Sequence, residues 1–355
     1  NAKDVVLVDG IRTEAALNRF NTQTNNVDTI EVLKGPSSVL YGGDALSGAI
    51  NVIRKKPQGI PAYDLAYKGG RFNTHQVAGD ATGPLAGYNL LYRVGASWNY
   101  SDGWRGAGAN RLNVSPSATW IMSEGARLTI HQSLTRDNFK GDGGVPVDII
   151  NLPGFDPNRR FSTPSDFALM KDSQTEALLN ANITPNWEFR DAFLLRRTNE
   201  EYFVTEEVDF DPPNSVDRFG LYFNHHRRPY VNQAEILGHV DFLGMRHRLL
   251  FGYDFRDFST RTDVTKGGGF FQFTPMSLVD FVETNPPIAN FPIVRKTYQF
   301  NRTHAGFWQD QIDVTKKLLG RHNLDLHDGL HKNRHSLLAT LLERDRASNL
   351  EGQLV

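Results

Sequence analysis

The sequence contains no cysteine and no long apolar run. The absence of cysteine excludes disulfide bonds, thiolate metal sites and cysteine nucleophiles, and it suits a chain that passes through an oxidising compartment. No stretch reaches the roughly eighteen apolar residues of a membrane-spanning helix, and the mean hydropathy is −0.44. Strands of a transmembrane barrel need only about ten residues of alternating polarity, so a β-barrel remains possible.

Net charge is lacking as well. The 39 Lys and Arg residues balance 40 Asp and Glu residues, so no overall field attracts nucleic acid. The sequence has no HExxH motif, phosphate-binding loop or nucleophile elbow, and we therefore expect no enzyme, no catalytic residue, no cofactor and no metal site. Because the chain starts at Asn1 without a basic and apolar leader, a signal peptide is either already removed or lies outside this segment, and we expect the second.

The residues typical of strands and turns are plentiful. Aromatic residues make up 11% of the chain, which also contains 31 Gly and 17 Pro. Three regions differ in pattern. Residues 1–61 contain frequent glycines, residues 62–315 alternate in polarity, and residues 316–355 show neither of these patterns. In the first region, Val5–Val8, Ile30–Leu33 and Ala49–Ile53 are predicted strands. The segment Pro36–Tyr41 is predicted to form about one helical turn.

Polarity alternates with a period of two along much of the second region. From Tyr88 to Tyr100, one face collects aromatic and small apolar residues and the other collects mostly polar ones, and the pattern recurs at Ala126–Asp137, Ala234–Phe242 and Leu249–Phe255. Roughly ten such segments lie between residues 62 and 313, without an amphipathic helix between them. The sequence therefore predicts an all-β fold, a transmembrane antiparallel β-barrel with one apolar and one polar face.

Connections between these segments alternate in length. Short turns are predicted at Gly83–Gly87, Ser123–Gly125, Pro185–Asn186 and Leu243–Arg246. Long polar loops are predicted at Phe139–Met170, Glu200–Tyr230 and Ser259–Tyr298. Short turns at one end and long loops at the other are typical of an outer-membrane barrel.

Residues 27–57 carry the most specific motif, VDTIEVLKGPSSVLYGGDALSGAINVIRKKP. It resembles the plug domain of TonB-dependent outer-membrane receptors of the siderophore type. The motif residues, which we expect to be structural, are Glu31, Lys34, Gly35, Pro36, Ser38, Tyr41, Gly42, Gly48, Asn51, Lys56 and Pro57. The resemblance implies that residues 1–61 are the C-terminal part of a small α+β plug domain. It also implies that residues 62–315 are the first half of a barrel of about 22 strands, so that the barrel is incomplete in this fragment.

The resemblance also implies a function and partners. A TonB-dependent receptor in the outer membrane of a Gram-negative bacterium takes up its ligand actively, with energy from the TonB complex, and a ferric siderophore is the expected ligand. We expect this fragment to be non-functional alone, and the barrel to be a monomer in contact with lipopolysaccharide. The alternatives are a receptor for vitamin B12, haem or an oligosaccharide, a passive porin, and a soluble all-β binding module or enzyme.

Candidate ligand contacts lie in the plug and in the long loops. Arg19, Phe20 and Asn21, between two predicted plug strands, mix polar and aromatic groups that suit a ferric chelate. The charged plug residues, Arg54 among them, are expected to pair with a charged barrel wall. An acidic group at Glu206–Asp211 and a basic, aromatic group at His225–Tyr230 are expected on solvated loops.

The last region departs from the barrel pattern. No aromatic residue follows Trp308, and four of the 11 histidines gather at His322, His327, His331 and His335. A helix-like leucine stripe follows at residues 337–342. We therefore interpret residues 316–355 as an aberrant tail, translated out of frame from about residues 317–320.

Overall fold

The computed structural model describes residues 5–13, 24–34, 48–86, 89–152, 155–279, 283, 287–288, 290–313 and 346–347. These residues form two sheets, and no helix among them is long and apolar enough to cross a membrane. The predicted helical turn at residues 36–41 lies outside the described residues, as does most of the predicted aberrant tail.

The small sheet has four strands in the order β2-β1-β4-β3. They are β1 (Val5–Val8), β2 (Ile11–Thr13), β3 (Val27–Lys34) and β4 (Gly48–Arg54). Strand β1 is parallel to β4, and the other pairs are antiparallel. Asp9 and Gly10 join β1 to β2 with φ angles of 50° and 84°, the left-handed conformation that a tight hairpin needs.

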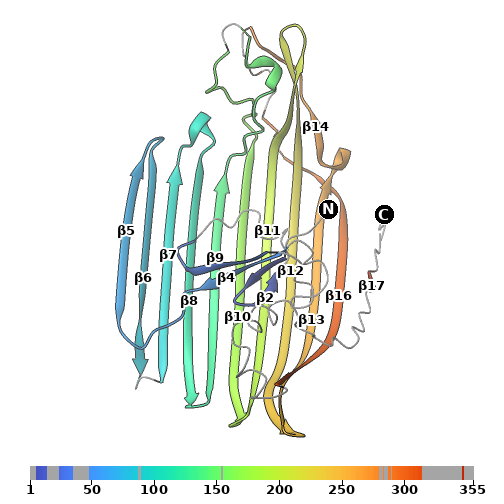
Figure 1. Ribbon diagram of the computed structural model, residues 1–355. Helices are drawn as coiled ribbons and strands as arrows, with labels where there is room; N and C mark the ends of the chain where they lie inside the picture. The colour runs from blue at the N-terminus through green and yellow to red at the C-terminus, as the bar shows by residue number, and fades with distance from the viewer. Residues whose placement is uncertain are drawn as a thin grey trace, which may run out of the picture.

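The large sheet is a meander of long antiparallel strands (Figure 1). The long strands are β5 (Ala62–Gly70), β6 (Thr74–Ala86), β7 (Leu90–Ser101), β8 (Ala109–Ser123), β9 (Ala126–Phe139), β10 (Phe167–Thr184), β11 (Trp187–Asp211), β12 (Ser215–Phe242), β13 (Met245–Thr265) and β16 (Ile293–Asp313). The short strands are β14 (Phe270–Gln272), β15 (Met276–Ser277) and β17 (Arg346–Ala347). Within the described residues this sheet does not close on itself, so it forms part of a barrel wall.

Three of the four predicted short turns, at Ser123–Gly125, Pro185–Asn186 and Leu243–Arg246, are confirmed, and they lie at one end of the wall. The turn predicted at Gly83–Gly87 is placed too early, because β6 continues to Ala86. The predicted loop after Phe139 is also confirmed, with a 3-10 helix η3 at Val147–Ile149. Two predicted loops are wrong in part. Strands β11 and β12 continue through residues 200–230 as one long hairpin, and β13 continues to Thr265 before the 3-10 helix η4 (Lys266–Gly269).

The wall buries polar side chains on one face and exposes apolar side chains on the other, which is the reverse of a soluble sheet. On β9, His131, Ser133, Thr135 and Asp137 point to the side of the small sheet and are buried. The opposite face exposes large apolar side chains, among them Leu65 at 81% and Trp120 at 53%. A soluble sheet buries its apolar face, whereas a barrel wall in a bilayer turns that face to lipid. The predicted alternation is thus confirmed, with the polar side inward.

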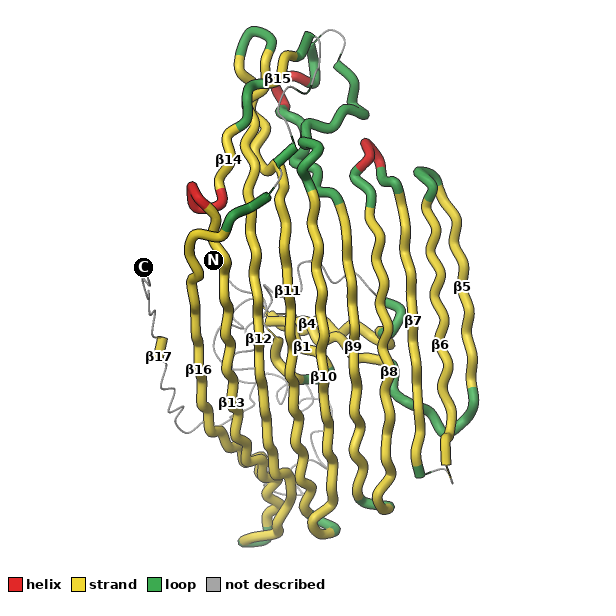
Figure 2. Tube along the Cα trace, turned by 180° about the vertical axis from the view of Figure 1, so that it is seen from behind, coloured by secondary structure: helices red, strands yellow, loops and turns green. Residues whose placement is uncertain are grey.

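The small sheet lies across the wall at about mid-height, on its polar side (Figures 1 and 2). An apolar contact joins the two sheets, because Ile11 of β2 packs against Leu194 of β11 and Val231 of β12. All three side chains are almost fully buried. We call the small sheet the plug sheet and the polar side of the wall the lumen face.

Candidate functional site

Arg54, the last residue of β4, is the main polar link between the plug sheet and the wall. Its Nε donates a hydrogen bond of 2.8 Å to Asp9, and its backbone N–H donates another of 3.0 Å to the same carboxylate. Its outer guanidinium nitrogen forms an ion pair with Glu176 of β10, which is fully buried. One guanidinium thus joins two carboxylates, one from each sheet.

The surroundings of Arg54 make this link costly to break. Burial lowers the pKa of the Arg54 guanidinium, and the Asp9 carboxylate opposes that shift. The group stays charged, because arginine does not lose its proton in proteins. Glu176 also accepts a hydrogen bond from Gln174 of the same strand. Removing one partner would leave an uncompensated buried charge, which is strongly destabilising.

Three further hydrogen bonds hold the plug region against the first strands of the wall. The Gln58 backbone N–H donates to Thr82 Oγ1 at 2.9 Å, and Arg93 donates to the Lys56 carbonyl at 3.0 Å. Ser97 Oγ donates to Asn25 Oδ1 at 3.2 Å. Each of these hydrogen bonds contributes about 1 kcal/mol to stability. Apart from the apolar contact of Ile11, the contact between the plug region and the wall is therefore polar.

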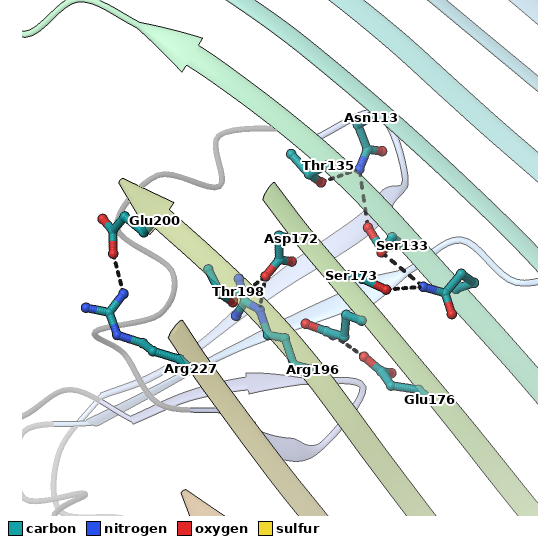
Figure 3. A network of polar contacts seen from close by, with 12 residues as sticks. Asn113, Ser133, Thr135, Asp172, Ser173, Glu176, Arg196, Thr198, Glu200 and Arg227 are labelled. Carbon is teal, nitrogen blue, oxygen red and sulfur yellow. Dashed lines mark hydrogen bonds and ion pairs between the residues drawn. The ribbon is translucent and has the colours of Figure 1, made fainter. Parts of the chain in front are cut away.

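The lumen face continues this polar character toward the long-loop end of the wall (Figure 3). Arg196 of β11 forms an ion pair with Asp172 of β10 at 2.7 Å, and Thr198 donates to the same carboxylate. Further along, Arg227 of β12 forms an ion pair with Glu200 of β11. Every one of these charges has an opposite partner on the neighbouring strand, so the lumen face is charged but balanced.

Aromatic side chains appear on this face close to the long-loop end. Tyr202 and Phe223 occupy paired positions on β11 and β12, with ring centroids 5.3 Å apart. His225 stacks on Phe223 at 5.3 Å. Tyr202 lies eight residues beyond Leu194, or about 26 Å along the strand at roughly 3.3 Å per residue. This aromatic group therefore stands well beyond the plug sheet, at the open end.

The predicted basic and aromatic group at His225–Tyr230 is only partly correct. These residues lie within β12 and not on a loop, so their side chains alternate between two faces. His225 and Arg227 face the lumen, whereas His226, Arg228 and Tyr230 face outward. Of the predicted acidic group, the side chains of Glu206 and Glu207 lie outside the described residues. Within the described part of the chain, no three His, Asp or Glu residues gather as metal ligands.

The motif residues within the described ranges have structural contacts. Asn51 accepts a hydrogen bond from the Gly10 N–H and donates one to Glu31, both at 3.0 Å, so it ties the β1–β2 turn to β3. Gly48 has a φ of 151°, and a Cβ there would lie 2.4 Å from the Leu33 carbonyl oxygen. Eight of the candidate ligand contacts and motif residues lie outside the described residues: Arg19, Phe20, Asn21, Gly35, Pro36, Ser38, Tyr41 and Gly42.

The pairing of Arg54 with the wall agrees with the sequence expectation, but its two partners were missed. Asp9 belongs to an Asp-Gly pair that predicts only a hairpin turn. Glu176 is one of several polar residues that alternate along β10. No local pattern marks which wall residue lies opposite a plug residue more than a hundred positions away.

A polar cavity of about 460 Å³ lies beside this ion pair, on the side of the short turns. Arg54 and Lys55 line it from the plug side, and His131, Arg127 and Glu176 line it from the wall. Its lining carries both signs of charge, so it is suited to water and polar solutes.

The long loops are folded against the wall. Arg218 of β12 is buried, and its guanidinium donates to the Phe161 carbonyl at 3.0 Å and to Glu283 at 2.7 Å. Phe161 and Glu283 belong to two different loops, so Arg218 joins both of them to β12. Sequence reasoning missed this role of Arg218, because the residue falls in a segment that was predicted as a loop.

Comparisons with known proteins agree with this architecture. Residues 2–49 match the profile of the TonB-dependent Receptor Plug Domain. The metal-pseudopaline receptor CntO of Pseudomonas aeruginosa is 26% identical over 237 residues, which cover 64% of this chain and 33% of the relative. The ferrioxamine B receptor of Salmonella typhimurium is 25% identical over 365 residues, which cover 96% of this chain and 51% of the relative.

Solved structures show the same fold. The siderophore receptor PiuA from Acinetobacter baumannii superposes with a TM-score of 0.74 at 17% identity, over 88% of this chain and 48% of that one. The closed form of the ferric-catecholate import receptor Fiu from Escherichia coli gives 0.75 at 18% identity, over 89% and 47%. The chain spans about half or less of the length of these relatives.

Proposed function

Because the chain belongs to the TonB-dependent receptors of the Gram-negative outer membrane, we propose that it takes part in the active uptake of a ferric siderophore. The observation that carries this proposal is the plug sheet, which lies across a polar lumen face and is bound there by Arg54 and Glu176. A passive pore has no use for such a stopper. The named relatives are receptors for metal chelates, which favours a chelate as the ligand.

The proposal includes the following layout. Residues 1–61 are the end of the plug domain, residues 62–315 are the first half of the barrel, and residues 316–355 are an out-of-frame tail. The whole receptor acts as a monomer in contact with lipopolysaccharide and draws energy from the TonB complex. The nucleotide sequence of the gene tests whether the tail is out of frame. Another reading frame should then encode aromatic, alternating strands after about residue 317.

The ligand is proposed to bind at the extracellular end, above the plug sheet. Tyr202, Phe223 and His225 offer ring faces on the lumen side there. Arg19, Phe20 and Asn21 are the proposed contacts from the plug. Uptake then requires the plug to move away from the wall, which separates Arg54 from Glu176.

Growth on single iron sources tests the proposed function. A strain that makes no siderophore of its own, with and without the full-length gene, is grown in iron-poor medium with one ferric chelate at a time. We expect growth on one ferric siderophore to require both the gene and TonB. Growth that depends on the gene only with haem, vitamin B12 or an oligosaccharide would replace the ligand, and uptake without TonB would indicate a porin.

A pair of matched variants then tests the proposed binding residues. Phe223→Ala removes a lumen-facing ring, and we expect roughly tenfold weaker ligand binding, as for a central aromatic contact in an interface. Phe300→Ala removes an exposed ring on the outward face of β16 and should leave binding unchanged. Equal binding by wild type and Phe223→Ala would contradict this location.

A further inference from the structure

One row of paired wall residues crosses the lumen face where the plug sheet meets the wall. Each member of the row lies opposite the next in the strand register, and the members are Ser117 of β8, His131 of β9, Glu176 of β10, Leu194 of β11 and Val231 of β12. The chemistry changes along the row. It is polar on β8 and β9, carries the ion pair with the plug on β10, and is apolar on β11 and β12.

The apolar end of the row holds the plug sheet by burial. Ile11 packs there against Leu194 and Val231, and all three side chains are at most 1% exposed. Lifting Ile11 away would expose apolar surface to water, which costs free energy in proportion to the area. The ion pair of Arg54 with Glu176 lies next to this contact, at the boundary with the polar end of the row.

The lumen face of β7, β8 and β9 carries short polar side chains. Asn113 Nδ2 donates to Thr135 Oγ1 at 2.8 Å (Figure 3), and Ser115 Oγ donates to the Gly95 carbonyl at 3.2 Å, so these bonds lie within the wall. Ser97 differs, because it donates to Asn25 of the plug. Water can therefore replace the plug here while the wall keeps most of its own bonds. The buried short polar residues are Ser97, Asn113, Ser115, Ser117, Thr119, Ser133 and Thr135.

Three buried polar atoms on this side have no hydrogen-bond partner within the described part of the chain. They are Asn25 Nδ2, Asn113 Oδ1 and His131 Nε2. A buried polar atom without a partner is unfavourable, and water or a polar solute that enters beside it supplies one. Opening on this side therefore gains hydrogen bonds, whereas the side chains of Leu194 and Val231 would gain none.

The polar cavity of about 460 Å³ lies at the short-turn end of the same strands. Ser117 and Thr119 line it from β8, and Thr129 and His131 line it from β9. From Thr119 to Asn113 the strand covers about 20 Å at roughly 3.3 Å per residue. Polar side chains thus lead from the cavity along β8 and β9 toward the extracellular end.

We propose that the plug sheet turns about Ile11 and opens a water-filled passage along β8 and β9. Separation of Arg54 from Glu176 frees the side of the plug that faces β9, while Ile11 stays packed on β11 and β12. This inference rests on the proposed uptake, which requires a passage, and adds the place where the passage opens. The transported chelate then moves past hydroxyl groups into the cavity and on to the periplasm.

Thiol labelling of the full-length receptor in detergent tests where the plug parts from the wall. The chain has no cysteine, so one introduced thiol reports on one site in a receptor free of other cysteines. Ser115→Cys reports on β8 and Val231→Cys reports on β12, at side chains that are 3% and 1% exposed. The probe is a sulfonated maleimide, and mass spectrometry measures the label. Each rate is divided by the rate of the same thiol in the urea-unfolded receptor.

Glu176→Gln releases the ion pair and should open the passage on one side. We expect Ser115→Cys to be labelled about a hundredfold faster in the Glu176→Gln background, the factor for loss of one partner of a buried ion pair. Val231→Cys should change less than about threefold, because Ile11 still buries it. Ile11→Ala added to Glu176→Gln removes the packed contact, and Val231→Cys should then be labelled at least about tenfold faster.

Two outcomes would overturn the proposal. Equal acceleration of both thiols would show that the whole plug leaves the wall, and unchanged labelling of Ser115→Cys would show that the plug parts elsewhere. The heat-dependent electrophoretic mobility of the barrel checks folding. Should a variant not fold, Ser133→Cys on β9 and Leu194→Cys on β11 replace the first pair, with the same expectation.

The labelling experiment and the growth experiment fail independently of each other. No siderophore is present during labelling, so a wrong location of the passage leaves the uptake proposal standing. Growth that does not depend on the gene would contradict the uptake proposal, and the labelling rates would still show which side of the plug opens.

Discussion

The ion pair between Arg54 and Glu176 should control how firmly the plug sheet is held. Glu176→Gln keeps the size of the side chain and removes its charge, which leaves Arg54 with Asp9 as its remaining partner. Losing one partner of a buried ion pair costs about 3–5 kcal/mol. Because Asp9 still neutralises Arg54, we expect the lower end of this range, about 3 kcal/mol, which corresponds to roughly a hundredfold larger population of the displaced plug.

Hydrogen exchange of the full-length receptor in detergent measures this population. Amides of β1 and β4 should exchange about a hundredfold faster in Glu176→Gln if they exchange through displacement of the plug sheet. Glu188→Gln is the matched control, because Glu188 pairs with Arg190 at a partly exposed site of the same wall. Its effect should stay within about 1 kcal/mol, as for surface ion pairs. Unchanged exchange of β4 in Glu176→Gln would refute the reasoning.

Two further variants test the plug sheet and the loops. Gly48→Ala should destabilise the plug sheet by about 1–3 kcal/mol, because the positive φ disfavours a Cβ and the Leu33 carbonyl oxygen lies too close to it. Urea unfolding measures this loss of stability. The control Gly59→Ala should be neutral, because a Cβ there meets no atom within 4 Å. Arg218→Gln removes the charged partner of Glu283 and should make the extracellular loops more sensitive to protease on intact cells, with barrel stability retained. Lys266→Gln, in the same loop region, should match wild type, and equal cleavage of both variants would contradict the role of Arg218.

Most of the membrane-spanning wall could be predicted from the sequence. Lipid on one side and a polar lumen on the other impose a strict alternation, which is visible from Leu90 onward and fixes each strand and its short turn. The turns at Pro185–Asn186 and Leu243–Gly244 follow from the same pattern, because the alternation stops there. These parts of the fold are local properties of the chain.

The extracellular hairpin and the plug contacts could not be predicted in the same way. Beyond the membrane, both faces of β11 and β12 meet water or loops, so polar residues occur on both and the segment around Arg218 looks like a loop. The pairing of Arg54 with Glu176 depends on how the plug sheet is oriented in the wall. That orientation is a long-range property, and alternation within β10 carries no information about it.

The polarity of the lumen face has a consequence for movement. A plug that covered an apolar surface would expose that surface to water on leaving, at about 25 cal/mol for each Å². Here it covers serine, threonine and charged side chains that water can solvate equally well, apart from the small contact of Ile11 with Leu194 and Val231. The work of opening is therefore concentrated in a few identifiable bonds. In the uptake that we propose, a pull applied at one end of the plug would break these bonds in sequence, and water would readily solvate the wall that the plug leaves.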